Sequence, residues 1–98
     1  MTNEKKEQSI NLHVPESIAN GDYANIVLCN YSKEEFVFDY AFLQPHVNKT
    51  TVTNRIVMSP GNAKKLAAIL AKNIQEYEKK AGPINNDPPQ NGIKFSIN

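Results

Sequence analysis

The feature that most constrains this fold is one long helix predicted between Ser59 and Gly82, with clear signals at both ends. The Ser59 hydroxyl can accept a hydrogen bond from an otherwise unpaired amide of the first turn. Pro60 suits the first helical position, where its missing N–H removes no helical hydrogen bond. Gly82 can adopt the left-handed conformation that ends a helix. Within this stretch, apolar residues recur every three or four positions and form one stripe, which we call the helix stripe: Ala63, Leu66, Ala67, Leu70, Ile74, Tyr77 and Ala81.

The residues before this helix predict β-strands. Ile10–Val14 alternates apolar and polar residues, as a half-buried strand does. Three further stretches are rich in β-branched and aromatic residues and predict strands at Tyr23–Tyr31, Phe36–Leu43 and Thr50–Met58. The sequence therefore predicts an α+β fold, with an antiparallel β-meander of about four strands followed by one long C-terminal α-helix.

The 98 residues are enough for one domain, which we expect to span residues 10–82. Residues 1–9 are polar and charged, and we expect a disordered arm there. Residues 83–98 begin with a segment rich in Pro, Asn and Gly and predict a flexible tail. Within this tail, Ile93–Ile97 alternates apolar and polar residues, so docking as a short strand stays open as an alternative.

The third predicted strand has Phe36, Phe38, Tyr40 and Phe42 on one face, because side chains alternate along a strand. We expect this face to continue through Ala24, Ile26 and Leu28 on one side and Val52, Ile56 and Met58 on the other, with the helix stripe lying on it. The same register places Asp39 opposite Arg55 on the other face, as a structural ion pair.

That other face is expected to be too apolar for contact with water alone. The chain has no second long helix to cover it, so a partner subunit is the simplest cover. We therefore expect a homo-oligomer, either a dimer or a dimer of dimers. Its predicted interface combines five strand residues with one residue beside the helix stripe: Val27, Cys29, Val37, Leu43, Val57 and Ile69.

Composition argues against several classes of protein. The net charge of +1 lacks the basic excess of a dedicated nucleic-acid-binding protein. The single cysteine cannot form an internal disulfide. No apolar run is long enough to span a bilayer, and the first residues do not resemble a signal peptide, so we expect a cytoplasmic protein.

No residue pattern points to catalysis or to a cofactor. The two histidines, His13 and His46, lack the companion ligands of a zinc site. Cys29 is expected to be a small buried side chain rather than a nucleophile. Ser59 is expected to cap the helix rather than to help bind a phosphate, because no glycine-rich loop accompanies it. We therefore expect a protein that is not an enzyme, with no metal and no cofactor.

Several motifs resemble a known family. The segments Tyr23-Ala24-Asn25 and Glu35–Asp39, and the pairs Ser59-Pro60, Asn73-Ile74 and Tyr77-Glu78, are similar to domain-of-unknown-function family 3467, whose members are small bacterial proteins. The resemblance extends from Ile10 to about Ile84 and implies no established activity. The order of antiparallel strands followed by a long helix also resembles the SecB export chaperones, although this chain lacks their second helix.

Three functional hypotheses follow. The first is a non-enzymatic oligomeric module that binds protein in an unknown pathway. The second is a SecB-like holdase chaperone that binds unfolded chains. The third is an accessory protein associated with nucleic acid, which the charge balance argues against.

Overall fold

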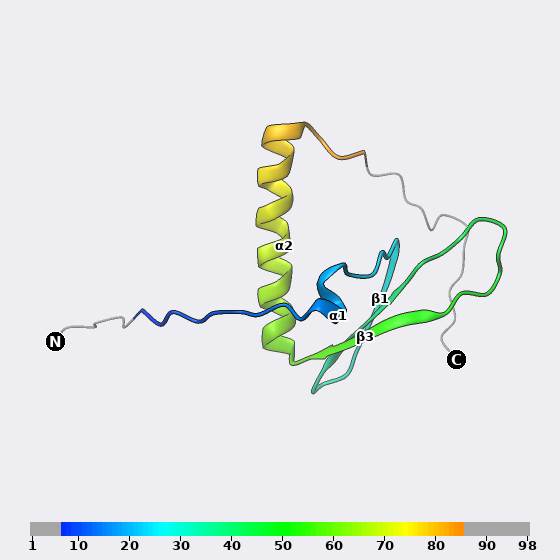
Figure 1. Ribbon diagram of the computed structural model, residues 1–98, viewed down its shortest axis with the longest axis horizontal. Coiled ribbons are helices and arrows are strands. Elements are labelled where there is room, and N and C mark those ends of the chain that lie inside the picture. Colours follow the sequence, from blue (N-terminus) through cyan, green and yellow to red (C-terminus); the bar gives the residue numbers. More distant parts are fainter. Residues whose placement is uncertain (1–6, 86–98) are drawn as a thin grey trace.

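A computed structural model describes residues 7–85 of the chain. Its elements follow in the order α1 (Glu16–Ala19), β1 (Ile26–Tyr31), β2 (Phe36–Ala41), β3 (Val52–Met58) and α2 (Pro60–Ala81) (Figure 1). The α+β class and the C-terminal helix are confirmed. The described residues contain three strands rather than four, because residues 10–14 are extended without a strand partner. The predicted arm and tail lie largely outside the described residues.

The three strands form an antiparallel sheet in the order β1-β2-β3. Asp39 pairs with Arg55, as predicted, and Ile56 and Met58 lie opposite Phe38 and Phe36. The predicted pairing of β1 is wrong by one residue. Directly opposed residues share a face, and here Val27, Cys29 and Tyr31 lie opposite Tyr40, Phe38 and Phe36, whereas Ile26 and Leu28 lie on the other face.

These pairings define two faces of the sheet, named here by their central residues. The aromatic face carries Val27, Cys29, Tyr31, Phe36, Phe38, Tyr40, Asn54, Ile56 and Met58. The ion-pair face carries Ile26, Leu28, Asn30, Val37, Asp39, Ala41, Val52, Arg55 and Val57.

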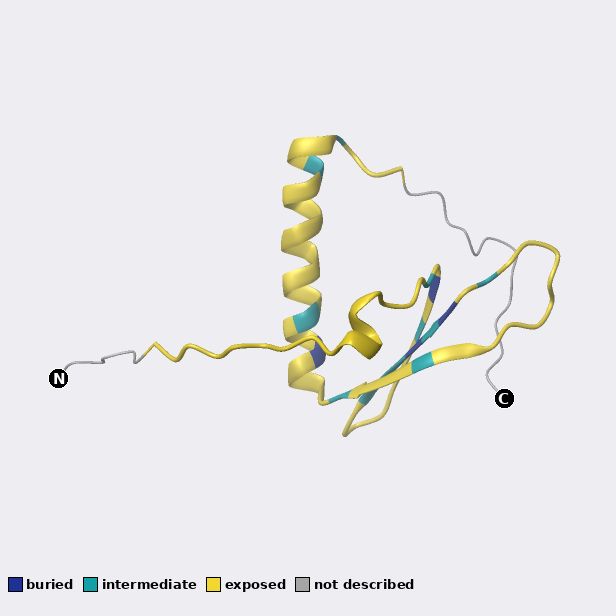
Figure 2. Ribbon diagram, viewed as in Figure 1, coloured by how far each residue is buried: buried dark blue, intermediate teal, exposed yellow. Residues whose placement is uncertain are grey.

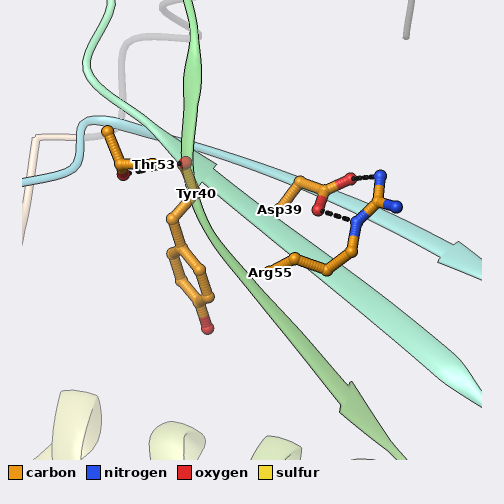
Figure 3. Close-up of polar contacts among 4 residues, drawn as sticks. All are labelled: Asp39, Tyr40, Thr53 and Arg55. Atoms are coloured by element: carbon orange, nitrogen blue, oxygen red, sulfur yellow. Dashed lines mark hydrogen bonds and ion pairs between the residues drawn. The ribbon is translucent and has the colours of Figure 1, made fainter. Parts of the chain in front are cut away.

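Val52 was predicted to share a face with the aromatic residues, and a β-bulge explains why it does not. Tyr40 pairs with Asn54 and Ala41 pairs with Val52, so Thr53 is the extra residue on β3. The Thr53 hydroxyl donates to the carbonyl oxygen of Tyr40 at 3.2 Å, which ties the bulge to β2 (Figure 3). The bulge inverts the alternation of β3 before Asn54 and moves Val52 to the ion-pair face.

Both predicted ends of α2 are confirmed. The Ser59 hydroxyl accepts from the amide of Asn62 at 3.2 Å, and Pro60 begins the helix. At the other end, Gly82 has φ of 90°, and its amide donates to the carbonyl oxygen of Glu78 at 2.9 Å. The Glu78 side chain also accepts from the amide of Ile84 at 2.9 Å, so it helps to direct the chain away from the helix.

The helix contacts the sheet only near its start, which corrects the expectation that the whole stripe lies on the sheet. Ala63 is buried and Leu66 is half-buried, whereas Leu70, Ile74 and Tyr77 are exposed (Figure 2). The axis of α2 diverges from the strands, so the later turns of the helix lie away from the sheet (Figure 1). At about 1.5 Å per residue the 22-residue helix is about 33 Å long, whereas strands of six or seven residues span about 20–24 Å.

Loss of the Ser59 cap is expected to destabilise the protein by about 1 kcal/mol, because one amide of the first turn loses its acceptor. Ser59→Ala should lower the midpoint of urea unfolding, followed by circular dichroism. Ser59→Asp is the control, since aspartate is an equally good cap and should leave the midpoint close to that of the unmodified protein. Equal midpoints for the alanine variant and the unmodified protein would contradict the cap's contribution.

Candidate interaction surface

The aromatic face of the sheet carries no charged residue. Its rings form a row, with Tyr31 and Phe36 stacked at 5.5 Å between ring centroids and Phe36 and Phe38 at 6.5 Å. Phe36, Phe38 and Tyr40 are half-buried, while the flanking Val27 and Ile56 are 46% and 44% exposed. The described chain therefore covers this face only in part.

The C-terminal half of the helix stripe is a second uncovered apolar surface. Leu70 is 54% exposed, Ile74 39% and Tyr77 57%. Ile84, beyond the end of α2, lines a shallow open depression together with Asn73, Ile74 and Tyr77. In Figure 3, the ring of Tyr40 points away from the Asp39–Arg55 pair, toward the side where turns of α2 are drawn. The aromatic face thus lies on the side of the sheet that faces α2.

The six predicted interface residues do not form one patch. Val27 and Cys29 lie on the aromatic face, whereas Val37 and Val57 lie on the ion-pair face. Leu43 follows β2 and is half-buried, and Ile69 is an exposed residue of α2. The error comes from the β1 register. An interface built on the aromatic face would include Val27 and Cys29 but not Val37 and Val57.

Asp39 and Arg55 form a two-point ion pair across β2 and β3 (Figure 3). Arg55 Nε donates to Asp39 Oδ1 at 2.6 Å, and Arg55 Nη2 donates to Oδ2 at 2.9 Å. Asp39 is only 2% exposed, whereas the Arg55 side chain is 56% exposed. The guanidinium therefore covers the carboxylate on one side and faces solvent on the other. Such a fork-to-fork contact is strong and also fixes the relative position of its partners.

The pair changes the acidity of both groups. Hydrogen bonds from Arg55, together with its positive charge, lower the pKa of Asp39 against the opposing effect of burial. The hydrogen bond and charge of Asp39 likewise raise the pKa of Arg55. A carboxylate with a lowered pKa and both oxygens engaged is a poor proton donor at neutral pH. The arrangement thus suits a structural role better than acid–base catalysis.

The remaining candidate residues are dispersed. His13 lies in the extended segment before α1, and His46 lies in the loop after β2 with φ of 66°. Cys29 is exposed on edge strand β1, which corrects the expectation that it is buried. Within residues 7–85, no three His, Cys, Asp or Glu side chains gather as a metal site. A second shallow depression, lined by residues of the loop after β2, lies at Leu43–Val47.

Two asparagines have positioning roles that the sequence pattern did not indicate. The Asn25 carboxamide donates to the Leu43 carbonyl at 2.9 Å and accepts from the Leu43 amide at 2.7 Å, so it acts as one more rung between β1 and β2. The Asn54 side-chain carboxamide donates through Nδ2 to Oδ2 of Asp22 at 2.9 Å and ties the segment before β1 to β3. A single asparagine before a strand is not part of any periodic pattern. Asn25 was therefore noted only as a member of the Tyr23-Ala24-Asn25 motif.

Comparison with protein families identifies the class of this protein. A family model described as "Protein of unknown function (DUF3467)" matches residues 1–86. The chain belongs to this family, as its motifs suggested. Neither the curated proteins nor the solved structures contain a match, so the layout similarity to SecB chaperones has no further support. None of the helices in the described part of the chain is long and apolar enough to cross a membrane.

The ion pair predicts how stability depends on acid. Because the pKa of Asp39 is lowered by folding, its contribution is fully present well above the ordinary aspartate value of about 3.9 and is lost as the pH falls through the lower folded value. Arg55→Gln should lower the urea midpoint clearly at pH about 7, and the difference from the unmodified protein should shrink near pH about 2. A difference that stays constant across this range would contradict a stabilising charge interaction.

Proposed function

We propose that this protein is a non-enzymatic protein-interaction module that acts as a homo-oligomer. The observation that carries the proposal is the apolar surface that one chain leaves uncovered on the aromatic face and on the C-terminal half of the helix stripe. Leu70, Tyr77 and Val27 are about half exposed on these two surfaces. Uncovered apolar surface of this kind marks a site of association when it is large.

The energetics favour association over a free monomer. Fully burying an aliphatic or aromatic side chain is worth about 1.5–3 kcal/mol. In the described part of the chain, the buried apolar residues are only Ile26, Ala41 and Ala63. A 98-residue chain buries a modest share of its surface by folding alone, so a subunit contact would add a large fraction of its apolar burial.

Light scattering of the full chain at tens of micromolar should give the mass of a dimer or of a pair of dimers. Leu70→Lys should shift this mass toward the monomer, because a charge would be buried without a partner. Leu70 is already half exposed within one chain, so the variant should still fold. Ala68→Lys is the matched control, since Ala68 is exposed on the helix away from the stripe and the same change should leave the mass unaltered.

A monomeric unmodified protein would contradict self-association. In that case, suppression of the aggregation of an unfolded model substrate would favour the holdase alternative. Salt-dependent retention on DNA or RNA would favour the nucleic-acid alternative.

A further inference from the structure

We propose that α2 pairs with α2 of a second copy in antiparallel orientation, with the two-fold axis near the helical turn between Leu70 and Ile74. The inference rests on the proposed self-association and specifies its geometry. It commits the exposed half of the helix stripe to one occupant, the same half of the stripe in another copy. Four observations support it: the spacing of the exposed stripe residues, the sizes of their side chains, the charged residues beside them and the position of the sheet.

The free residues have the spacing of a helix–helix seam. Ala67, Leu70, Ile74 and Tyr77 are exposed and recur at intervals of three and four residues, which is the pattern that two packed helices share. Ala63 is buried at the start of α2 and lies before this seam. The accessible part of the stripe therefore extends over residues 67–77 rather than over the whole helix.

Side-chain sizes along the seam complement each other only when the helices run in opposite directions. A two-fold axis between Leu70 and Ile74 sets Leu70 against Ile74 of the other copy and Ala67 against Tyr77 of the other copy. Each small side chain then faces a large one, as well-packed cores require. A parallel pair in register would set Tyr77 against Tyr77 and leave a gap between the two copies of Ala67.

Charges beside the seam fit the same orientation. Lys64 and Glu78 are 14 residues apart in the sequence, close to four turns at 3.6 residues per turn, so they lie on the same flank of the stripe. Like flanks meet in a two-fold antiparallel pair, and Lys64 of each copy would then approach Glu78 of the other. The Glu78 Oε2 atom already accepts from the Ile84 amide, which orients the carboxylate and leaves Oε1 for a lysine ammonium.

The sheet gives an independent argument. It joins α2 directly after Met58, at the N-terminal end of the helix, and contacts α2 through β3. Parallel pairing through the stripe would bring both sheets to the same end of the helix pair, where they would compete for space. Antiparallel pairing places the two sheets at opposite ends.

Cysteine cross-linking tests the orientation. In a Cys29→Ser background, the full chain carrying both Ala67→Cys and Tyr77→Cys should form a disulfide-linked dimer under mild oxidation. Each single cysteine variant should stay unlinked, because in antiparallel pairing residue 77 lies about 15 Å along the axis from residue 77 of the other copy. Covalent dimers from each single variant, together with the double one, would show parallel pairing and overturn the inference while leaving self-association intact.

Charge reversal gives a second, non-covalent test. Glu78→Lys should raise the dimer dissociation constant about tenfold, because it replaces two symmetric attractions with two repulsions. Adding Lys64→Glu should restore association, which a purely local role of Glu78 at the helix end would not allow. Glu76→Lys is the matched control for net charge, since Glu76 lies away from the seam. Failure of Lys64→Glu to rescue Glu78→Lys would overturn the pairing, and a monomeric unmodified protein would overturn both this inference and the proposed function.

Discussion

The contact between Asp39 and Arg55 is the constraint on which the rest of the structure depends. Two hydrogen bonds of 2.6 and 2.9 Å between planar groups hold β2 and β3 in a single register. A slip of one residue would turn every side chain of β3 to the other side of the sheet. The ion pair therefore decides that Ile56 and Met58 join Phe36 and Phe38, and that the aromatic face is free of charge. The carboxylate is nearly inaccessible, so losing the arginine would leave a buried charge without a partner.

Sequence patterns predicted the parts of the fold that local chemistry decides. Ser59 and Gly82 mark the ends of α2 because their side chain and backbone satisfy terminal amides and carbonyls. The alternation around Asp39 predicted the faces of β2, since aromatic and non-aromatic residues differ clearly there. These features need no knowledge of distant segments.

The errors arose where distant partners decide the outcome. In β1, apolar residues occur at both even and odd positions. Ile26 and Leu28 lie on one face and Val27 and Cys29 on the other, so the pattern fits either register. Hydrogen bonds between the Asn25 side chain and the Leu43 backbone help to select the observed register, and no periodic pattern in the sequence predicts them. Residues 10–14 alternate as a strand does, but a strand also needs a neighbour to complete its backbone hydrogen bonds. The exposure of the C-terminal half of α2 was missed for a related reason. An apolar stripe predicts that one side of a helix is covered, but it does not predict whether the same chain or another molecule covers it.

Because α2 extends beyond the sheet, its last turns depend on few contacts within one chain to stay helical. The final three turns are held by backbone hydrogen bonds and by the Gly82 and Glu78 contacts, with little tertiary packing from the described residues. Helical segments shorter than about 12–15 residues are marginal on their own in water. The backbone amides of these turns would exchange with solvent faster than those beside Ala63, and anything that binds the folded helix would slow them by mass action. If the chain self-associates as proposed, helix order at this end becomes a function of protein concentration, and folding and assembly become one equilibrium.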